Sequence, residues 1–134
     1  MNKGFTLIEL LIVIAIIGTL STMMFPNFLS AQDKAKEVAV KSVALSIQNA
    51  LENYNIDFGT YPLGSDTAVS DLYQTLSTEG YLSRPPVNPF SGETYQTADS
   101  AGKILYSYNQ TSGRYQLSAY KRDGVTEIMA VSNL

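Results

Sequence analysis

The chain has no cysteine and no histidine, and these absences remove several kinds of chemistry together. Disulfides, thiol nucleophiles, imidazole bases and the usual zinc ligands are all excluded. Basic residues are also scarce: nine Lys and Arg stand against twelve Asp and Glu, and no basic cluster interleaved with aromatics could follow a phosphate backbone. We therefore expect no nucleic-acid partner and no cofactor. Since no nucleophile and base can be paired without His or Cys, we also expect no enzyme activity.

Charge is almost missing from the first quarter of the chain. From Phe5 to Gln32 the only charged residue is Glu9, whereas every Lys and Arg except Lys3 lies at or after position 34. A helix of 21 residues from Phe5 to Phe25 would span roughly 30 Å, the thickness of the hydrocarbon layer. Residues 5–26 are therefore predicted to form a transmembrane or filament-core helix. A cleaved secretory signal or a helix buried in a soluble core are the alternatives, although one Lys before the run and "FLSA" after it suit a signal peptide poorly.

Glu9 is the unusual residue in this run. A carboxylate at mid-membrane depth costs about 2.5 to 3.5 kcal/mol on insertion scales, so such residues usually face a partner and carry a function. The sequence alone leaves two alternatives open, because Glu9 lies only one or two turns from the expected helix start. It either meets a partner outside the chain, or stays near the membrane surface and pairs with Phe5 of its own chain.

Residues 27–58 are predicted to continue the helix beyond Pro26, where a kink or local unwinding is expected. Apolar residues recur there at intervals of three and four, at Val40, Val43, Ala44, Ile47, Ala50, Leu51, Tyr54 and Phe58. The opposite, wet face is expected to carry Lys36, Lys41, Gln48 and Glu52. Such a helix has one stripe to bury against a partner within the chain.

Residues 59–134 are predicted to form a loop-rich head. Gly59 fits a helix C-cap, a short helix capped by Thr67 or Ser70 should end near Gly80, and the Pro-rich stretch "SRPPVNPFSG" excludes regular structure. Alternating residues then predict strands in "KILYSYN", "RYQLSAY" and "VTEIMAVSNL". The fold class is α+β: one long N-terminal helix whose stretch 40–58 covers a small antiparallel sheet of three or four strands.

The N-terminal "KG" followed by "FTLIELLIVIAIIG", with a proline eight residues beyond that glycine, resembles a type IV pilin or type II secretion pseudopilin. The first 30 or so residues match closely, and the rest matches in layout and in small motifs such as "PPVNPFSGETY". The resemblance implies a leader at residues 1–4, cut between Gly4 and Phe5 by a prepilin peptidase. It also implies N-methylation of Phe5, and pairing of Glu9 with the new Phe5 amine of a neighbouring copy during assembly.

Gly18 and Pro26 match family positions between which the helix commonly loses regularity in assembled filaments. Glycine and proline both disfavour helix, and Thr19, Ser21 and Thr22 can bond the released carbonyls. The alternative is a groove of small residues, Gly18-xxx-Thr22, that brings straight helices close together. Both interpretations place the segment in a bundle of helices from many copies.

The resemblance implies a homo-oligomeric helical filament, built from a precursor in the cytoplasmic membrane with its N-terminus in the cytoplasm. Our first expectation is a subunit of an extracellular type IV pilus-like filament. The second is a major pseudopilin of a type II secretion system, forming a periplasmic piston for protein export. A membrane-anchored binding module that never polymerises is a third. G-type pseudopilins carry a more acidic C-terminal calcium loop than "KRDGVTEIMAVSNL", so we expect no metal here.

Overall fold

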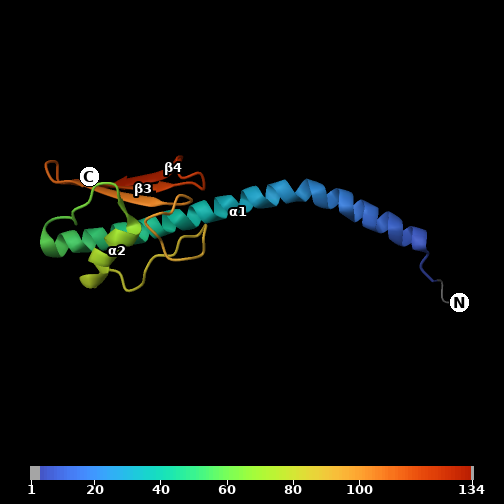
Figure 1. The fold of residues 1–134 in the computed structure, drawn as a ribbon, viewed down its shortest axis with the longest axis horizontal. Coiled ribbons are helices and arrows are strands. Elements are labelled where there is room, and N and C mark those ends of the chain that lie inside the picture. Colours follow the sequence, from blue (N-terminus) through green and yellow to red (C-terminus); the bar gives the residue numbers. More distant parts are fainter. Residues whose placement is uncertain (1–3, 134) are drawn as a thin grey trace. The chain divides into compact units, whose positions relative to one another are not determined.

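The computed structural model describes residues 4–133. The elements in chain order are α1 (Leu7–Phe58), β1 (Thr67–Ala68), α2 (Val69–Thr78), β2 (Ile104–Asn109), β3 (Arg114–Tyr120) and β4 (Glu127–Ser132) (Figure 1). The expected α+β fold, with one long N-terminal helix and a small antiparallel sheet, is confirmed. The chain divides into two compact units: Met1–Lys34, called the N-terminal unit below, and Ala35–Leu134, called the head unit.

Helix α1 begins at Leu7, two residues later than the sequence predicts, because Thr6 is the residue that caps it. The helix then continues without a break through Gly18 and Pro26 to Phe58. The local unwinding expected at Pro26 is therefore absent from the single chain. Gly59, with φ of 68°, ends the helix and donates its N–H to the Asn55 carbonyl at 2.8 Å, so the predicted C-cap is confirmed.

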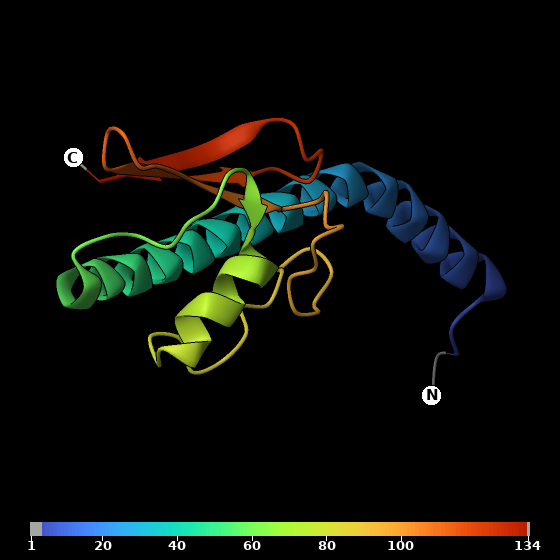
Figure 2. The same cartoon turned by 60° about the vertical axis from the view of Figure 1, so that its left-hand side comes forward.

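The core of the head unit forms between the sheet and the part of α1 that lies alongside it (Figure 2). Five residues of the predicted stripe are buried, namely Val40, Ala44, Ile47, Ala50 and Leu51. Val43 and Tyr54 are half-buried and pack against this core. The prediction was wrong for Phe58, which is 49% exposed because it lies at the last position of the helix.

The sheet has the order β1-β2-β3-β4, and every neighbouring pair is antiparallel. Ile104 and Tyr106 of β2 lie opposite Ala119 and Leu117 of β3, and all four are buried. In β2 the buried residues alternate with half-buried ones, following the period of two that predicted the strands, whereas in β3 the intervening Ser118 is buried as well. The fourth strand is β1, a two-residue segment that pairs through Thr67 with Tyr106.

The predicted wet face of α1 is wrong for three of its four residues, since Lys36, Gln48 and Glu52 are half-buried. Lys41 is exposed, but Glu52 is half-buried and accepts hydrogen bonds from the hydroxyls of Tyr61 at 2.9 Å and Tyr115 at 2.7 Å. The rings of these two tyrosines stack with centroids 4.6 Å apart. Glu52 therefore joins α1 to the following loop and to β3, and its carboxylate belongs to the polar edge of the core.

The start of α2 also differs from expectation. Thr67 pairs in β1 and Ser70 lies in the first helical turn, so the N-cap position falls to Ala68, which makes no side-chain cap. Residues 79–103 contain no helix or strand beyond one isolated bridge between Val87 and Thr94, as the prolines predict. This segment is held by Asn88, whose side chain makes three hydrogen bonds to its own loop.

Candidate assembly site

The first turn of α1 is closed by a reciprocal pair of polar residues. The Glu9 carboxylate accepts the Thr6 backbone N–H at 2.8 Å and the Thr6 hydroxyl at 2.7 Å, while the Glu9 N–H donates to that hydroxyl oxygen at 3.3 Å. This is the capping box, in which residues three apart satisfy each other's free backbone groups. Thr6 is thus a residue of the site that the sequence analysis missed, although T-x-x-E before an apolar run is its known signature.

The predicted processing residues lie just before this turn. Phe5 is 79% exposed, and a Cβ added to Gly4 would meet no other atom within 4 Å. Nothing in the described chain therefore excludes a side chain at position 4, so any demand for glycine must come from a partner. The rest of the predicted leader, residues 1–3, lies outside the described residues.

The apolar run that follows is bare. Every described side chain from residue 7 to residue 29 is exposed, including Ile12, Ile17 and Phe25. The helix contains a stretch with mean hydropathy of 2.3, long and apolar enough to cross a membrane by length and composition. Since burial of one such aliphatic side chain is worth about 1.5 to 3 kcal/mol, this surface requires lipid or other protein to cover it.

Three hydroxyls follow Gly18 on the same helix and bond back to its carbonyls. Thr19 donates to the Ile16 carbonyl, Ser21 to the Ile17 carbonyl and Thr22 to the Thr19 carbonyl, each at 2.8 Å. Hydroxyls bonded in this way soften and bend helices. The three hydroxyls thus bond carbonyls of an intact helix, and their role at carbonyls released by unwinding on assembly stays a prediction.

The hydrogen bonds of the Glu9 side chain in the described chain go to Thr6 and to none of the other predicted site residues. Its partner in the described chain is Thr6, and the Phe5 amine that the resemblance calls for does not exist before cleavage. Gly18 and Pro26 lie farther along α1, more than two and more than four turns beyond Glu9. The N-terminal unit therefore displays a capped, charged helix end followed by an uncovered apolar surface.

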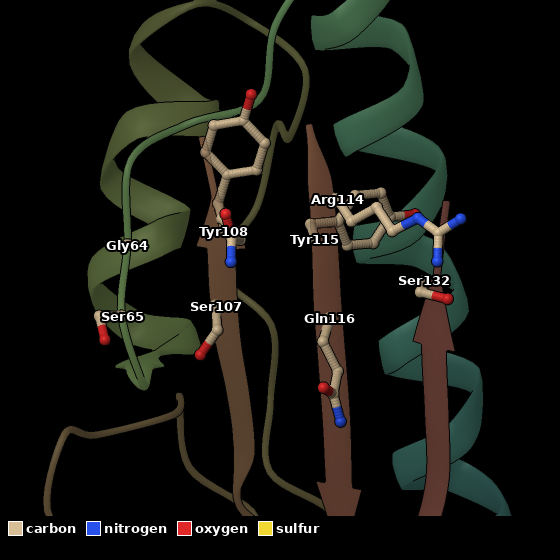
Figure 3. Close-up of a pocket in the computed structure, with 9 residues that line it drawn as sticks. Gly64, Ser65, Ser107, Tyr108, Arg114, Tyr115, Gln116 and Ser132 are labelled. Atoms are coloured by element: carbon tan, nitrogen blue, oxygen red, sulfur yellow. The ribbon is translucent and has the colours of Figure 1, made fainter. Parts of the chain in front are cut away.

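The head unit offers a second kind of surface. A pocket of about 550 Å³ lies at the end of the sheet, and the side chains of Ser107, Gln116 and Ser132 line it in one row across β2, β3 and β4 (Figure 3). Ser107 donates to the Asp66 carboxylate at 3.1 Å and accepts the Asp66 N–H at 2.9 Å, which ties the loop before β1 to β2. Hydroxyl, amide and guanidinium groups in this arrangement can form hydrogen bonds, but the lining residues contain no nucleophile–base–orienter set.

These features define a class: a chain with an exposed apolar N-terminal helix, long enough to cross a membrane by length and composition, and a small α+β head. Residues 1–25 match the family model described as "Prokaryotic N-terminal methylation motif". The chain is 32% identical to type II secretion system core protein G of Escherichia coli (strain K12) over 100 residues, 69% of each chain. It is 31% identical to the protein of that name from Pseudomonas aeruginosa over 131 residues, which cover 92% of this chain and 85% of the relative.

The relative from Aeromonas hydrophila, with the same name, is 34% identical over 105 residues, or 71% of each chain. No solved structure matches the fold significantly. The chain belongs to the type IV pilin and type II secretion pseudopilin family. It is accordingly a pilus-like filament subunit whose membrane-anchored precursor is a substrate of prepilin peptidase and of a secretion or pilus assembly system.

Proposed function

We propose that the chain is the major pseudopilin of a type II secretion system, assembled into a periplasmic filament that moves folded proteins outward. The observation that carries this proposal is the similarity to proteins named type II secretion system core protein G, which extends over 92% of the chain in one relative. The uncovered apolar helix supports it physically, since only lipid and then other copies can bury that surface.

Assembly starts from the capped helix end. Cleavage after Gly4 frees an amine on Phe5, four residues before Glu9 and on the same face of the helix. The Glu9 carboxylate, held by Thr6, then pairs with the Phe5 amine of a neighbouring copy. In the apolar interior of a filament an unpaired charge would cost several kcal/mol, so this pair fixes the register between copies as well as joining them.

The precursor is placed in the cytoplasmic membrane with its N-terminus in the cytoplasm and its head unit outside. The charge distribution alone does not decide this orientation, because Lys3 and the pair Lys34 and Lys36 flank the apolar run on opposite sides. The leader motif supports it, since the peptidase acts on the cytoplasmic side in the family that the motif resembles. We further propose that the chain has no enzymatic activity of its own.

A type IV pilus subunit is the second candidate, and the β3–β4 turn favours it. Both carboxylate oxygens of Asp123 are engaged within this turn: Oδ1 accepts the N–H groups of Val125 and Thr126 at 2.9 and 2.8 Å, and Oδ2 accepts the Thr126 hydroxyl at 2.5 Å. Among the described residues, no group of three acidic side chains is placed to hold a metal. The turn thus departs from the acidic calcium loop of G-type pseudopilins.

The decisive experiment deletes the gene and returns variants to the cell, with secretion of exoproteins and sheared surface filaments measured separately. Wild type should restore secretion. Glu9→Ala should abolish secretion while cleavage after Gly4 continues, because the buried amine then lacks its partner. The matched variant Thr6→Val removes the cap hydroxyl but keeps the carboxylate, and it should retain partial secretion. Normal secretion by Glu9→Ala would refute the pairing, and restored pili without any change in secretion would favour the second candidate.

A further inference from the structure

The hairpin between β2 and β3 carries a sequence motif that the assembly of filaments does not use. Asn109, Gln110 and Thr111 form the pattern Asn-x-Ser/Thr with a residue other than proline in the middle, and it is the only such pattern in the 134 residues. This pattern is the acceptor site for attachment of a sugar to the asparagine amide. Because three residues also match by chance, the structure around the amide decides whether it can react.

The motif lies at an exposed turn. Asn109 is the last residue of β2, and every residue from 109 to 114 is exposed. A Cβ added to Gly113 would meet no other atom within 4 Å, so the space beside the turn is open. The hairpin belongs to the head unit, whereas the apolar run that lipid or other copies must cover belongs to the N-terminal unit. An enzyme can therefore reach the motif in the folded head unit.

The turn holds the side chain of Asn109 by its oxygen. The Oδ1 atom accepts the N–H groups of Thr111 at 3.0 Å and Ser112 at 3.1 Å, which makes an Asx turn. The Nδ2 atom, on the other side of the planar amide, has no hydrogen bond to any residue of the described chain. Asn88 and Asn133, by contrast, donate their Nδ2 groups to neighbouring residues. The acceptor nitrogen of the motif is thus fixed in place and unengaged.

The third residue of the motif is equally accessible. Thr111 is exposed, and its hydroxyl makes no hydrogen bond within residues 4–133. The pattern requires a hydroxyl at this position, so an enzyme that reads the pattern must contact this group. The N–H of Thr111 is bonded to the Asn109 Oδ1, which keeps the hydroxyl and the acceptor amide together on one turn.

Asn109 also lines the pocket of about 550 Å³ at the end of the sheet. Arg114, Gln116 and Ser132 line the same pocket, and Figure 3 shows their side chains beside one another on β3 and β4. The side chains of Arg114 and Ser132 make no hydrogen bond to the rest of the described chain, so both have donors to offer. A sugar carries several hydroxyls, and one attached at Asn109 finds hydrogen-bond partners in the adjoining pocket.

We propose that Asn109 is a site of N-glycosylation and that the attached sugar lies over this pocket. In the reaction, Nδ2 forms a bond to the anomeric carbon of a sugar diphosphate. The bond from that carbon to the diphosphate oxygen breaks, the diphosphate leaves with the electron pair, and Nδ2 gives one proton to a base of the transferase. The donor diphosphate is carried either on a polyprenyl lipid or on a nucleotide. The inference is independent of whether the filament serves secretion or a pilus.

The test examines the full chain purified from its native cells. Trypsin cuts after Lys103 and Arg114, and the peptide between these cuts contains Asn109 and no other asparagine. Mass spectrometry should find sugar on this peptide, and fragmentation that leaves the sugar attached should assign it to Asn109. Sugar that disappears in a strain unable to load polyprenyl lipids identifies the lipid donor, and sugar that persists there identifies the nucleotide donor. A peptide without sugar overturns the proposal.

Variants of the turn separate the amide from the neighbouring hydroxyls. Asn109→Gln and Thr111→Val should both lose the sugar, whereas Thr111→Ser keeps the hydroxyl of the motif and should retain it. Ser112→Ala is the matched control, because it removes a hydroxyl of the same turn that lies outside the motif, and it should be modified as wild type. Sugar that remains on the peptide of Asn109→Gln is bound to a hydroxyl and overturns the assignment.

The position of the sugar has its own readout. Thr111→Val keeps Asn109 and the backbone N–H groups that hold it, so it provides an unglycosylated chain with the same turn. Hydrogen exchange in residues 114–116 should be slower in the glycosylated chain than in this variant. Equal exchange rates in the two chains contradict a sugar that lies over the pocket.

Discussion

Ile17 and Ile47 are isoleucines of the same helix, yet the first is 57% exposed and the second 1%. The head unit covers Ile47 with its own strands, whereas the N-terminal unit has no element besides α1 in the described chain. The comparison shows that one helix meets two burial requirements from different sources. The apolar face around Ile47 is buried when the chain folds. The apolar face around Ile17 is left for lipid and then for other copies to cover.

The same comparison applies to polar chemistry. The only charge in the apolar run, Glu9, is held by Thr6, three residues away at the helix end. In the head unit, polar groups are joined across long sequence distances: the Tyr106 hydroxyl, for example, donates to the Pro62 carbonyl at 2.7 Å. All nine tyrosines lie at or after position 54. A perturbation that acts on tyrosine should therefore separate the two units.

Raising the pH is the largest such perturbation. The hydrogen bond to Asp57 raises the pKa of Tyr81 to about 12, and burial, with Glu52 nearby, raises the pKa of Tyr61 to about 12. Burial also raises the pKa values of Tyr95, Tyr106 and Tyr115. Because these pKa values exceed the ordinary 10.0, keeping the tyrosine hydroxyls protonated stabilises the folded head unit. This stabilisation is complete below pH 10 and is lost as the pH rises through about 12.

In detergent, we expect the head unit to unfold over this range, with tyrosinate absorbance and loss of strand circular dichroism in one transition. The helix of the N-terminal unit, which carries no tyrosine, should persist in the micelle. Tyrosinate that appears near pH 10 with the strands intact would show that the head does not protect its hydroxyls.

Leucine truncation tests the burial difference directly. Leu51 is fully buried in the head core and Leu20 is 57% exposed. Leu51→Ala should lower the free energy of unfolding by about 2 to 5 kcal/mol, because it removes buried methyl groups and leaves a cavity. Leu20→Ala should change it by no more than about 0.5 kcal/mol in the detergent-solubilised chain and act on filament yield instead. Denaturant unfolding monitored by tyrosine fluorescence measures both, and equal losses would remove the distinction.

The regular parts of both units could be predicted from spacing alone. Intervals of three and four residues located the buried face of α1, and alternation located β2, β3 and β4. The role of Glu52 could not be predicted, since Tyr61 and Tyr115 lie 9 and 63 residues away and only the folded chain brings them together. Ala68 became an N-cap for a similar reason: Thr67 pairs with Tyr106 of a distant strand.

The candidate site divides in the same way. The local motif Thr6-x-x-Glu9 can be read from the sequence, because a capping box needs only two residues three positions apart. The processing and assembly roles of Gly4, Phe5, Glu9, Gly18 and Pro26 remain predictions, since they depend on a peptidase and on neighbouring copies. Asn88 shows what the sequence cannot predict. Its motif, "PPVNPFSGETY", is visible in the sequence, but its three hydrogen bonds depend on the path of a loop that prolines and glycines leave undetermined.

Two glycines with the same φ angle test how tightly the head unit is packed. Gly102 and Gly113 both have φ of 66°, but a Cβ at Gly102 would lie 2.5 Å from the Phe90 ring and 3.1 Å from Val40, whereas one at Gly113 would meet nothing within 4 Å. Gly113→Ala should cost about 1 kcal/mol for the left-handed backbone, and Gly102→Ala about 2 to 4 kcal/mol for backbone and overpacking together. Equal losses of unfolding free energy would show that Phe90 moves aside freely.

Replacing Glu52 tests the polar edge of the head core. Glu52→Ala leaves the hydroxyls of Tyr61 and Tyr115, two buried residues, without their acceptor, and should lower the free energy of unfolding by about 1 to 3 kcal/mol. Glu52→Gln retains one acceptor oxygen and should recover part of that loss. Both variants should leave membrane insertion and cleavage after Gly4 unchanged, because the carboxylate acts only within the head unit. A Glu52→Ala chain as stable as wild type would mean that water replaces the carboxylate, and the tyrosine pair would then owe its position to ring packing alone.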